Sequence, residues 1–433
     1  MLKKIVFYIV TIWLVLYNNS LMYEADLGYS WSHIPIPKFF RFVEILVITV
    51  LYIVAIIKYA KDRSLGKTKL FVFLLFCLSI LGIIVSFNFS YSYYQFVSIY
   101  LLLSPLWLYD VFCSIGIDEN FIKRVVKFYF GYILLNALVA LFVHIPNYWP
   151  VHSDNVNGFF SDAHVFGTFM AMTSIAFFAK FIYEKKLKFL IFSNFVLLIS
   201  FFSSNEKVII ANLLFIFILL FTYSKVTRRV TYIFAGFVLF LMFSNFDIES
   251  FLEPMGIDFR LFWLIKSIDF SQIGPIKAWQ IAMHYWLTNP YTFLFGLGPG
   301  NYASAGALAA FTEGVKNLIY QQNDFYISMS ELAFNSSFDR PFNFFTNLLV
   351  EFGFVGFTIF FMLVFKIVKT VYVQKNLTGL NKILRIVFLF NMFVFFFTGL
   401  IMPGEWMTQI LSYPTMLLAS YFFYLKRNSS ITK

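Results

Sequence analysis

The chain has 433 residues, of which 60% are hydrophobic, 22% are aromatic and only 13% are charged, with a formal net charge of +11. Soluble domains carry roughly 25% charged residues, so this composition excludes an ordinary soluble protein and indicates a membrane protein. Its two cysteines, Cys77 and Cys113, suggest neither a disulfide framework nor a metal site, and we interpret both as packing residues.

Apolar runs of about 16 to 20 residues recur along the chain, the length that a helix needs to cross a bilayer core. The first follows Lys3 and Lys4 without a small-residue cleavage site, so we interpret it as a retained span. We therefore expect an all-α polytopic membrane protein with about twelve transmembrane helices. The runs lie at about 5–22, 42–57, 70–88, 95–112, 126–144, 166–183, 189–203, 208–223, 230–246, 353–371, 384–401 and 406–425.

The distribution of basic residues predicts the orientation. If the N-terminus is cytoplasmic, 25 of the 33 Lys and Arg residues fall on the inner side, as the positive-inside rule requires. Residues 1–246 then hold nine spans, residues 247–342 form one large, polar, partly helical extracytoplasmic loop, and residues 343–433 hold three spans and a cytoplasmic tail. Both termini are cytoplasmic, and the positive charge contacts anionic membrane lipids rather than nucleic acid.

The segment NPYTFLFGLGPGNY (289–302) places Gly296, Gly298 and Gly300 at alternate positions of the large loop. A dinucleotide-binding loop would need a preceding strand and access to a cytoplasmic cofactor. These glycines follow a helical-looking stretch, KAWQIAMHYWLTNP, and are expected outside the cell. We interpret them as a tight exit from a helix that ends at Pro290, with the glycines supplying positive φ angles.

Four segments, in this order and with this topology, resemble the O-antigen polymerase and ligase superfamily. They are NGFFSDAHVFGTF (157–169), which opens the sixth span, SSNEKVIIANLL (203–214), which opens the eighth, FGLGPGNY (295–302), and FNFFTNLLVEFGFVG (342–356). In the last segment Asn343, Glu351, Gly353 and Gly356 have the spacing of the family's motif. The four segments cover a small part of the chain, whereas the topology covers all of it.

The resemblance implies an enzyme of the bacterial cytoplasmic membrane that moves a glycan from undecaprenyl pyrophosphate to an acceptor hydroxyl on the outer face. Polymerases of O-antigen, capsule or a similar polysaccharide use another lipid-linked repeat unit as acceptor, whereas ligases use lipid A core. No cofactor or metal is needed, because the substrate carries its own leaving group. The implied partners are the undecaprenyl-pyrophosphate-linked oligosaccharide and a chain-length regulator and flippase of the same pathway.

Within this resemblance we favour a polymerase. Ligases carry a histidine where this chain has Phe342, so the proposed base of a ligase is missing. The arginine that the family places shortly before Gly158 is also absent, with Asn155 and Asn157 in its neighbourhood. A flippase or another transporter of lipid-linked oligosaccharides is the alternative from a different class. It would not need the large outer loop.

The leaving pyrophosphate needs fixed cations, and arginine binds phosphate with two parallel hydrogen bonds. Arg260 and Arg340 are the only arginines of the large loop. Each either contacts pyrophosphate or pairs with a neighbouring aspartate. Lys207 stands where the family has an arginine and either faces a cavity or pairs with Glu206.

The remaining candidates follow from the motifs. His164 either serves as acid, base or phosphate donor, or is a hydrogen-bonded histidine of the membrane interface. Glu351 either catalyses or orients the outer loop. The candidate substrate-binding residues are Lys277, Asn343, Gly298, Gly300 and Asn301.

The charge distribution makes a direct prediction about topology. A reporter enzyme that is active only outside the cytoplasm should be active when fused after Gly300 and silent when fused after Arg229. Reporter activity and fusion protein level are measured together in intact cells. The reverse pattern at the two sites would overturn the orientation.

Overall fold

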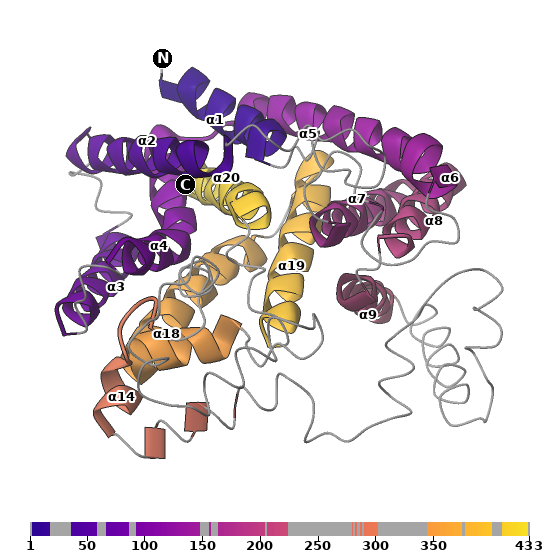
Figure 1. Cartoon of the computed structure of the whole chain (residues 1–433). Coiled ribbons are helices and arrows are strands. Elements are labelled where there is room, and N and C mark those ends of the chain that lie inside the picture. The colour runs from indigo at the N-terminus through magenta and orange to yellow at the C-terminus, as the bar shows by residue number, and fades with distance from the viewer. Residues whose placement is uncertain are drawn as a thin grey trace.

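The computed structural model describes most of the helical part of the chain. The described residues are 2–17, 36–58, 66–85, 92–147, 156, 163–203, 206–223, 279, 282–283, 286–287, 290–301, 344–374, 377–400 and 409–431. Within these ranges the protein consists of helices and connecting turns, with no strand (Figure 1). The predicted all-α class is therefore confirmed for the described part of the chain.

A helix lies at each predicted span except the ninth, 230–246, which is outside the described residues. Five of the described helices are long and apolar enough to cross a membrane, and four shorter ones are apolar. The helices are α1 (Leu2–Tyr17), α2 (Ile36–Lys58), α3 (Gly66–Val85), α4 (Ser92–Ile115), α5 (Glu119–Val139) with a π-helical turn (Ala140–His144), α6 (Ile145–Asn147), α7 (Ala163–Glu184), α8 (Leu187–Phe201), α9 (Glu206–Tyr223), α14 (Pro290–Phe295), α18 (Phe344–Tyr372), α19 (Leu380–Gly399) and α20 (Gln409–Ile431).

The tenth predicted span differs from the structure in one respect. The predicted start at residue 353 lies inside α18, which begins at Phe344 and has a non-helical residue, Gly353, in its interior. All residues from 344 to 353 are buried. A helix that is buried on every side lacks the 3.6-residue periodicity that would reveal it in a sequence. The glycine therefore marks a kink within α18 rather than its beginning.

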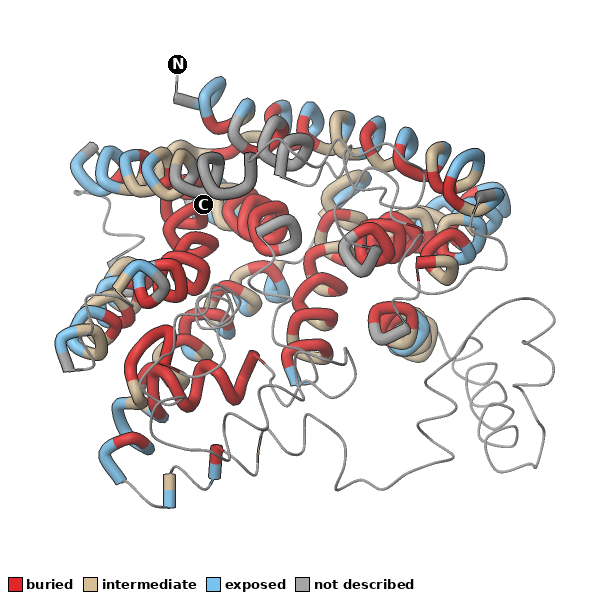
Figure 2. The backbone as a smooth tube through the Cα atoms, in the orientation of Figure 1, coloured by how far each residue is buried: buried red, intermediate tan, exposed pale blue. Residues whose placement is uncertain are grey.

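Helix α4 occupies the centre of the bundle. Every residue from 97 to 113 is buried, and α2, α3 and α20 pack around it (Figure 2). Three buried hydroxyl groups connect it to α20: the Tyr413 hydroxyl donates to Ser104 Oγ (3.2 Å) and lies 3.4 Å from the Tyr100 hydroxyl. A polar contact of this kind lets α4 pack closely without leaving hydroxyl groups unsatisfied in an apolar interior.

Two hydrophobic cores hold the helices together. One surrounds α4 and includes α18 and α20, and the other lies among α5, α7, α9 and α19. Phenylalanine rings pack against one another in both, for example Phe344 against Phe360 and Phe395 in the first core and Phe215 against Phe390 in the second. Helix α19 contributes side chains to both cores and joins them.

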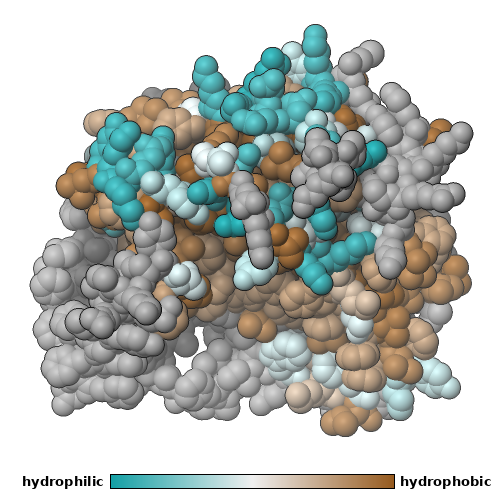
Figure 3. Space-filling model, turned by 180° about the vertical axis from the view of Figure 1, so that it is seen from behind, coloured by the Kyte–Doolittle hydropathy of each residue, from teal (hydrophilic) through white to brown (hydrophobic). Residues whose placement is uncertain are grey.

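The outer helices present apolar side chains to their surroundings. Large hydrophobic residues are more than a third exposed on α2, α3, α5 and α8, including Ile57, Phe73, Ile84, Leu134 and Phe192. On the face shown in Figure 3, hydrophilic residues gather in the upper part and hydrophobic residues cover much of the remainder. A surface of this kind suits the hydrocarbon of a bilayer and agrees with the predicted membrane location.

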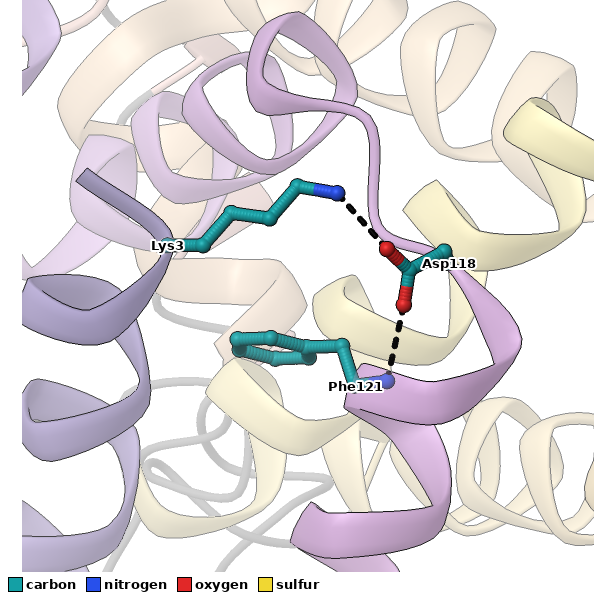
Figure 4. Close-up of polar contacts among 3 residues, drawn as sticks. All are labelled: Lys3, Asp118 and Phe121. Carbon is teal, nitrogen blue, oxygen red and sulfur yellow. Dashed lines mark hydrogen bonds and ion pairs between the residues drawn. The ribbon is translucent and has the colours of Figure 1, made fainter. Parts of the chain in front are cut away.

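Charged residues that the prediction assigns to one side of the membrane meet at one end of the bundle. Lys3 Nζ lies 2.7 Å from Asp118 Oδ2 and joins α1 to the start of α5 (Figure 4). The other oxygen of Asp118 accepts from Phe121 N (2.9 Å) and caps the first turn of α5. The hydrogen bond from Lys3 lowers the pKa of Asp118, with a further contribution from the Phe121 amide.

These contacts predict how α5 responds to mutation. Asp118→Ala should lower the free energy of unfolding by about 1 kcal/mol, because it removes a helix cap. Asp118→Asn retains the capping oxygen, and Lys3→Met removes only the exposed ion pair, which is worth about 0–1 kcal/mol. Both should therefore cost less than Asp118→Ala. Thermal unfolding of the purified protein in detergent measures all three.

The pKa shift adds a pH dependence. Since the pKa of Asp118 is lower in the folded than in the unfolded protein, its contribution is complete above the unfolded value, about 4. That contribution is lost as the pH falls through the folded value. The difference in the free energy of unfolding between wild type and Asp118→Ala should therefore become smaller in strong acid. A gap that widens on acidification would contradict the assignment.

Candidate functional site

The glycine turn (residues 296–301) follows directly on α14. Gly296 N donates to Thr292 O (3.0 Å), and Gly296, Gly298 and Gly300 have φ angles of +78°, +91° and +75°. These are left-handed conformations that residues with a Cβ atom rarely adopt. The expected positive φ angles are confirmed. Pro290 is the first residue of α14, a position that its fixed φ angle favours. Residues 288 and 289, where the preceding helix is expected to end, lie outside the described residues.

The turn pairs with the kink in α18 through backbone hydrogen bonds. Leu297 N donates to Val350 O (2.8 Å), and Gly298 N donates to Glu351 O (3.0 Å). In a regular helix these carbonyl groups would accept from the following turn. The break at Gly353, with φ 67° and ψ −179°, turns the helix aside at this point. The glycine turn supplies the donors that the broken helix does not.

The two segments approach so closely that side chains have no room. A Cβ atom on Gly353 would lie 2.3 Å from Leu294 O and 2.5 Å from Gly296 N. A Cβ atom on Gly296 would lie 2.3 Å from Glu351 O. The atoms that would clash belong to the backbone and cannot move aside. Both glycines are therefore required by the available space as well as by their φ angles.

Helices α3 and α4 enclose the turn on its other sides. A Cβ atom on Gly82 of α3 would lie 2.8 Å from the Pro299 ring, and one on Gly300 would lie 3.0 Å from Gln95 Cα of α4. Residues 298–301 are buried in consequence. The glycine turn is thus a packed element of the bundle.

Glu351 joins the turn to α18 with its side chain as well. It is 1% exposed, and its Oε2 atom accepts from Gly300 N at 2.7 Å. Burial of a carboxylate is costly unless hydrogen bonds compensate for the lost water, and a backbone amide is a strong donor to it. Glu351 was expected either to catalyse or to orient the outer loop. Its hydrogen bond with Gly300 N is a contact that orients the loop.

Asn301 completes this group. Its Nδ2 atom donates to Leu297 O (2.9 Å) and closes the turn. Its Oδ1 atom is buried and has no hydrogen-bond partner among the described residues. Buried amide oxygens generally accept a hydrogen bond. The Oδ1 atom of Asn301 could therefore accept one from a hydroxyl group of a ligand.

The structure brings four of the candidate residues together, namely Glu351, Gly298, Gly300 and Asn301. Two others have only their backbone described: His164 lies in the first turn of α7, and Lys207 is the second residue of α9. The start of α7 contacts the end of α8, because Ser200 Oγ donates to Gly167 O (2.8 Å). The four candidates that lie outside the described residues are Arg260, Arg340, Lys277 and Asn343.

Residues that sequence reasoning did not select also line the turn. Gln95 and Ser98 of α4 lie against Gly300 and are at most 2% exposed. A polar residue within an apolar run is a general signal for such positions. That signal does not tell which polar residues will share a site, because the segments that form it are distant in sequence.

Asp110 of α4 was missed as well. Its side chain is 1% exposed, and neither carboxylate oxygen has a hydrogen-bond partner among the described residues. It lies on the same central helix as Gln95, towards the opposite end. It is therefore separate from the glycine turn.

The described residues include no group of three or more His, Cys, Asp or Glu side chains that could hold a metal ion. No protein-family model matches the chain, and no curated protein matches it.

The geometry predicts the effect of adding a methyl group to the junction. Gly353→Ala and Gly296→Ala should each destabilise the protein by about 2 kcal/mol or more, because a strained φ angle costs about 1–3 kcal/mol and the clash with backbone adds to it. Thermal unfolding in detergent measures the change.

Gly131→Ala is the matched control. Gly131 lies within α5, and a Cβ atom there would meet nothing within 4 Å. This substitution should be neutral or stabilise the protein by about 0.5–1 kcal/mol, the ordinary gain of alanine over glycine in a helix. If Gly353→Ala behaved like the control, α18 would not need the kink and the turn would not hold it.

Proposed function

We propose that this chain is a polymerase of oligosaccharide repeat units linked to undecaprenyl pyrophosphate, acting on the outer face of the bacterial cytoplasmic membrane. The observation that supports it most is the pairing of the glycine turn with α18. Gly300 and Glu351 are 51 residues apart in sequence and share a hydrogen bond. Two of the segments on which the family resemblance depends thus form one packed unit, as parts of a common site would.

The proposed reaction is a glycosyl transfer. A hydroxyl of the acceptor repeat unit attacks the anomeric carbon of the donor sugar, and the bond from that carbon to the pyrophosphate oxygen breaks. The electron pair leaves with undecaprenyl pyrophosphate, and the hydroxyl proton passes to a base. The donor supplies the activated bond, so no oxidant, reductant or nucleotide enters the step.

The proposed roles follow from this charge development. Arg260 and Arg340, with Lys207 and Lys277, stabilise the negative charge that grows on the leaving pyrophosphate. His164 receives the proton of the attacking hydroxyl.

The glycine turn has a different role in this proposal. Glu351 is a positioning residue, because its Oε2 atom is already bound to Gly300 N. The buried Oδ1 atom of Asn301 accepts a hydrogen bond from a sugar hydroxyl, and Asn343 also binds the glycan. Gly298 shapes the turn instead of binding the glycan, because its N–H already donates to Glu351 O.

The decisive experiment supplies the purified protein in detergent with its native lipid-linked repeat units alone. A ladder of longer carrier-linked products should form, with a chelator present and without lipid A core. A flippase would lengthen nothing in detergent, where there are no two sides to cross. Gel separation of the extracted products measures the ladder.

The arginine variants control for catalysis in the same assay. Arg340→Ala should shorten or abolish the ladder while the protein remains folded, because loss of a bidentate charged contact costs about 2–5 kcal/mol. Arg340→Lys should restore it poorly, since lysine cannot form both hydrogen bonds. Folded wild-type protein that transfers glycan only after lipid A core is added would be a ligase, and the polymerase proposal would fail.

A further inference from the structure

Part of the large outer loop has an unusual composition. No residue from Ala278 to Thr312 is Asp, Glu, Lys or Arg, although the loop as a whole is polar. Roughly one residue in four is charged in a typical soluble domain. The same stretch contains Trp279, Trp286 and Tyr291, and tryptophan and tyrosine are enriched where membrane meets water.

Apolar side chains in this stretch form an exposed row. Met283, Leu287, Tyr291 and Phe295 follow one another at intervals of four residues, have helical conformation, and are 55%, 85%, 78% and 56% exposed. Tyr291 and Phe295 lie four apart in α14 and so on the same side of that helix, whereas Met283 and Leu287 precede it in the chain. We call these four residues the apolar stripe.

Other residues of the same stretch contact the bundle. Ala282 is fully buried, and Trp286 packs edge-on against Phe293 at a centroid distance of 5.9 Å. Phe293 in turn stacks on Phe354 of α18 at 5.5 Å, and Trp279 packs against the core around α4. The stripe therefore belongs to a fixed element and points away from the protein.

The stripe is continuous with the surface that faces lipid. Phe354, on which Phe293 stacks, is itself 48% exposed. Helix α3 ends beside the glycine turn, where Gly82 lies against Pro299. Leu81 and Ile84 at this end of α3 are 56% and 66% exposed. The segment that bears the stripe therefore adjoins exposed apolar residues of α3 and α18, and no residue from Ala278 to Asn301 is Asp, Glu, Lys or Arg.

We propose that the segment bearing the apolar stripe lies in the interfacial layer of the membrane, with the stripe inserted among the lipid acyl chains. Its partner is the lipid bilayer itself. An uncharged segment that exposes apolar side chains and contains two tryptophans is suited to this layer. The glycine turn is then held at the depth of the headgroups. This inference concerns the structure in the membrane and does not rest on the proposed function.

Spin labels in lipid nanodiscs test the proposal. Single cysteines are introduced as Leu287→Cys and Tyr291→Cys in a background with Cys77→Ala and Cys113→Ala, and the nanodiscs contain phosphatidylcholine and phosphatidylglycerol. Both labels should collide more often with oxygen, which concentrates in lipid, than with a water-soluble nickel complex. Leu134→Cys, exposed in the middle of α5, gives the value for lipid, and Asn120→Cys, exposed at its start, gives the value for water.

The outcomes separate the possibilities. A ratio of oxygen collisions to nickel collisions that is higher at both stripe positions than at Asn120→Cys, and so shifted towards the value of Leu134→Cys, supports insertion. Ratios equal to that of Asn120→Cys at either position overturn it, because the stripe would then face water. Low collision rates with both oxygen and the nickel complex would mean that protein covers the stripe, and this result would overturn the proposal as well. Thermal unfolding of each labelled variant shows whether it is folded.

Discussion

The architecture depends on one constraint: backbone polar groups inside a membrane protein must find hydrogen-bond partners within the protein. The kink at Gly353 turns carbonyl groups of α18 away from their helical partners, and the glycine turn meets them with its own amides. Each segment supplies hydrogen-bond partners that the other lacks by itself. The position of α14 and the burial of Glu351 follow from the same pairing.

The central helices of the bundle bury hydrogen-bonded polar groups, whereas the outer helices expose apolar side chains. The central helices bury matched polar groups, such as the hydroxyls of Tyr413 and Ser104 or the Asn391 amide that donates to Thr415 Oγ1 at 3.0 Å. The outward faces of α2, α3 and α5 carry exposed aliphatic and aromatic side chains. Hydrogen bonds between helices therefore specify which faces meet, while the apolar exterior suits the lipid.

The length of the apolar runs was enough to locate the helices, because a bilayer of fixed thickness imposes that length. The positive φ angles of the glycine turn were also predictable from its composition. The first half of α18 was not, since a segment buried on all sides has no periodicity to detect. The approach of Gln95 and Ser98 to the turn depends on packing between segments far apart in sequence, which single residues do not encode. Arg260 and Arg340 remain predictions outside the described residues.

The enclosure of α4 has a consequence for biogenesis. Its hydroxyl contact with α20 joins residues 313 positions apart, and α20 is among the last parts of the chain to be synthesised. Until then α4 carries Asp110 and its hydroxyl groups without the helix that will cover one of its sides. A nascent chain in this condition exposes polar groups to lipid or depends on the insertion machinery to shield them. Substitutions in α20 should accordingly act early, on how much protein accumulates in the membrane, before they act on what the finished protein does.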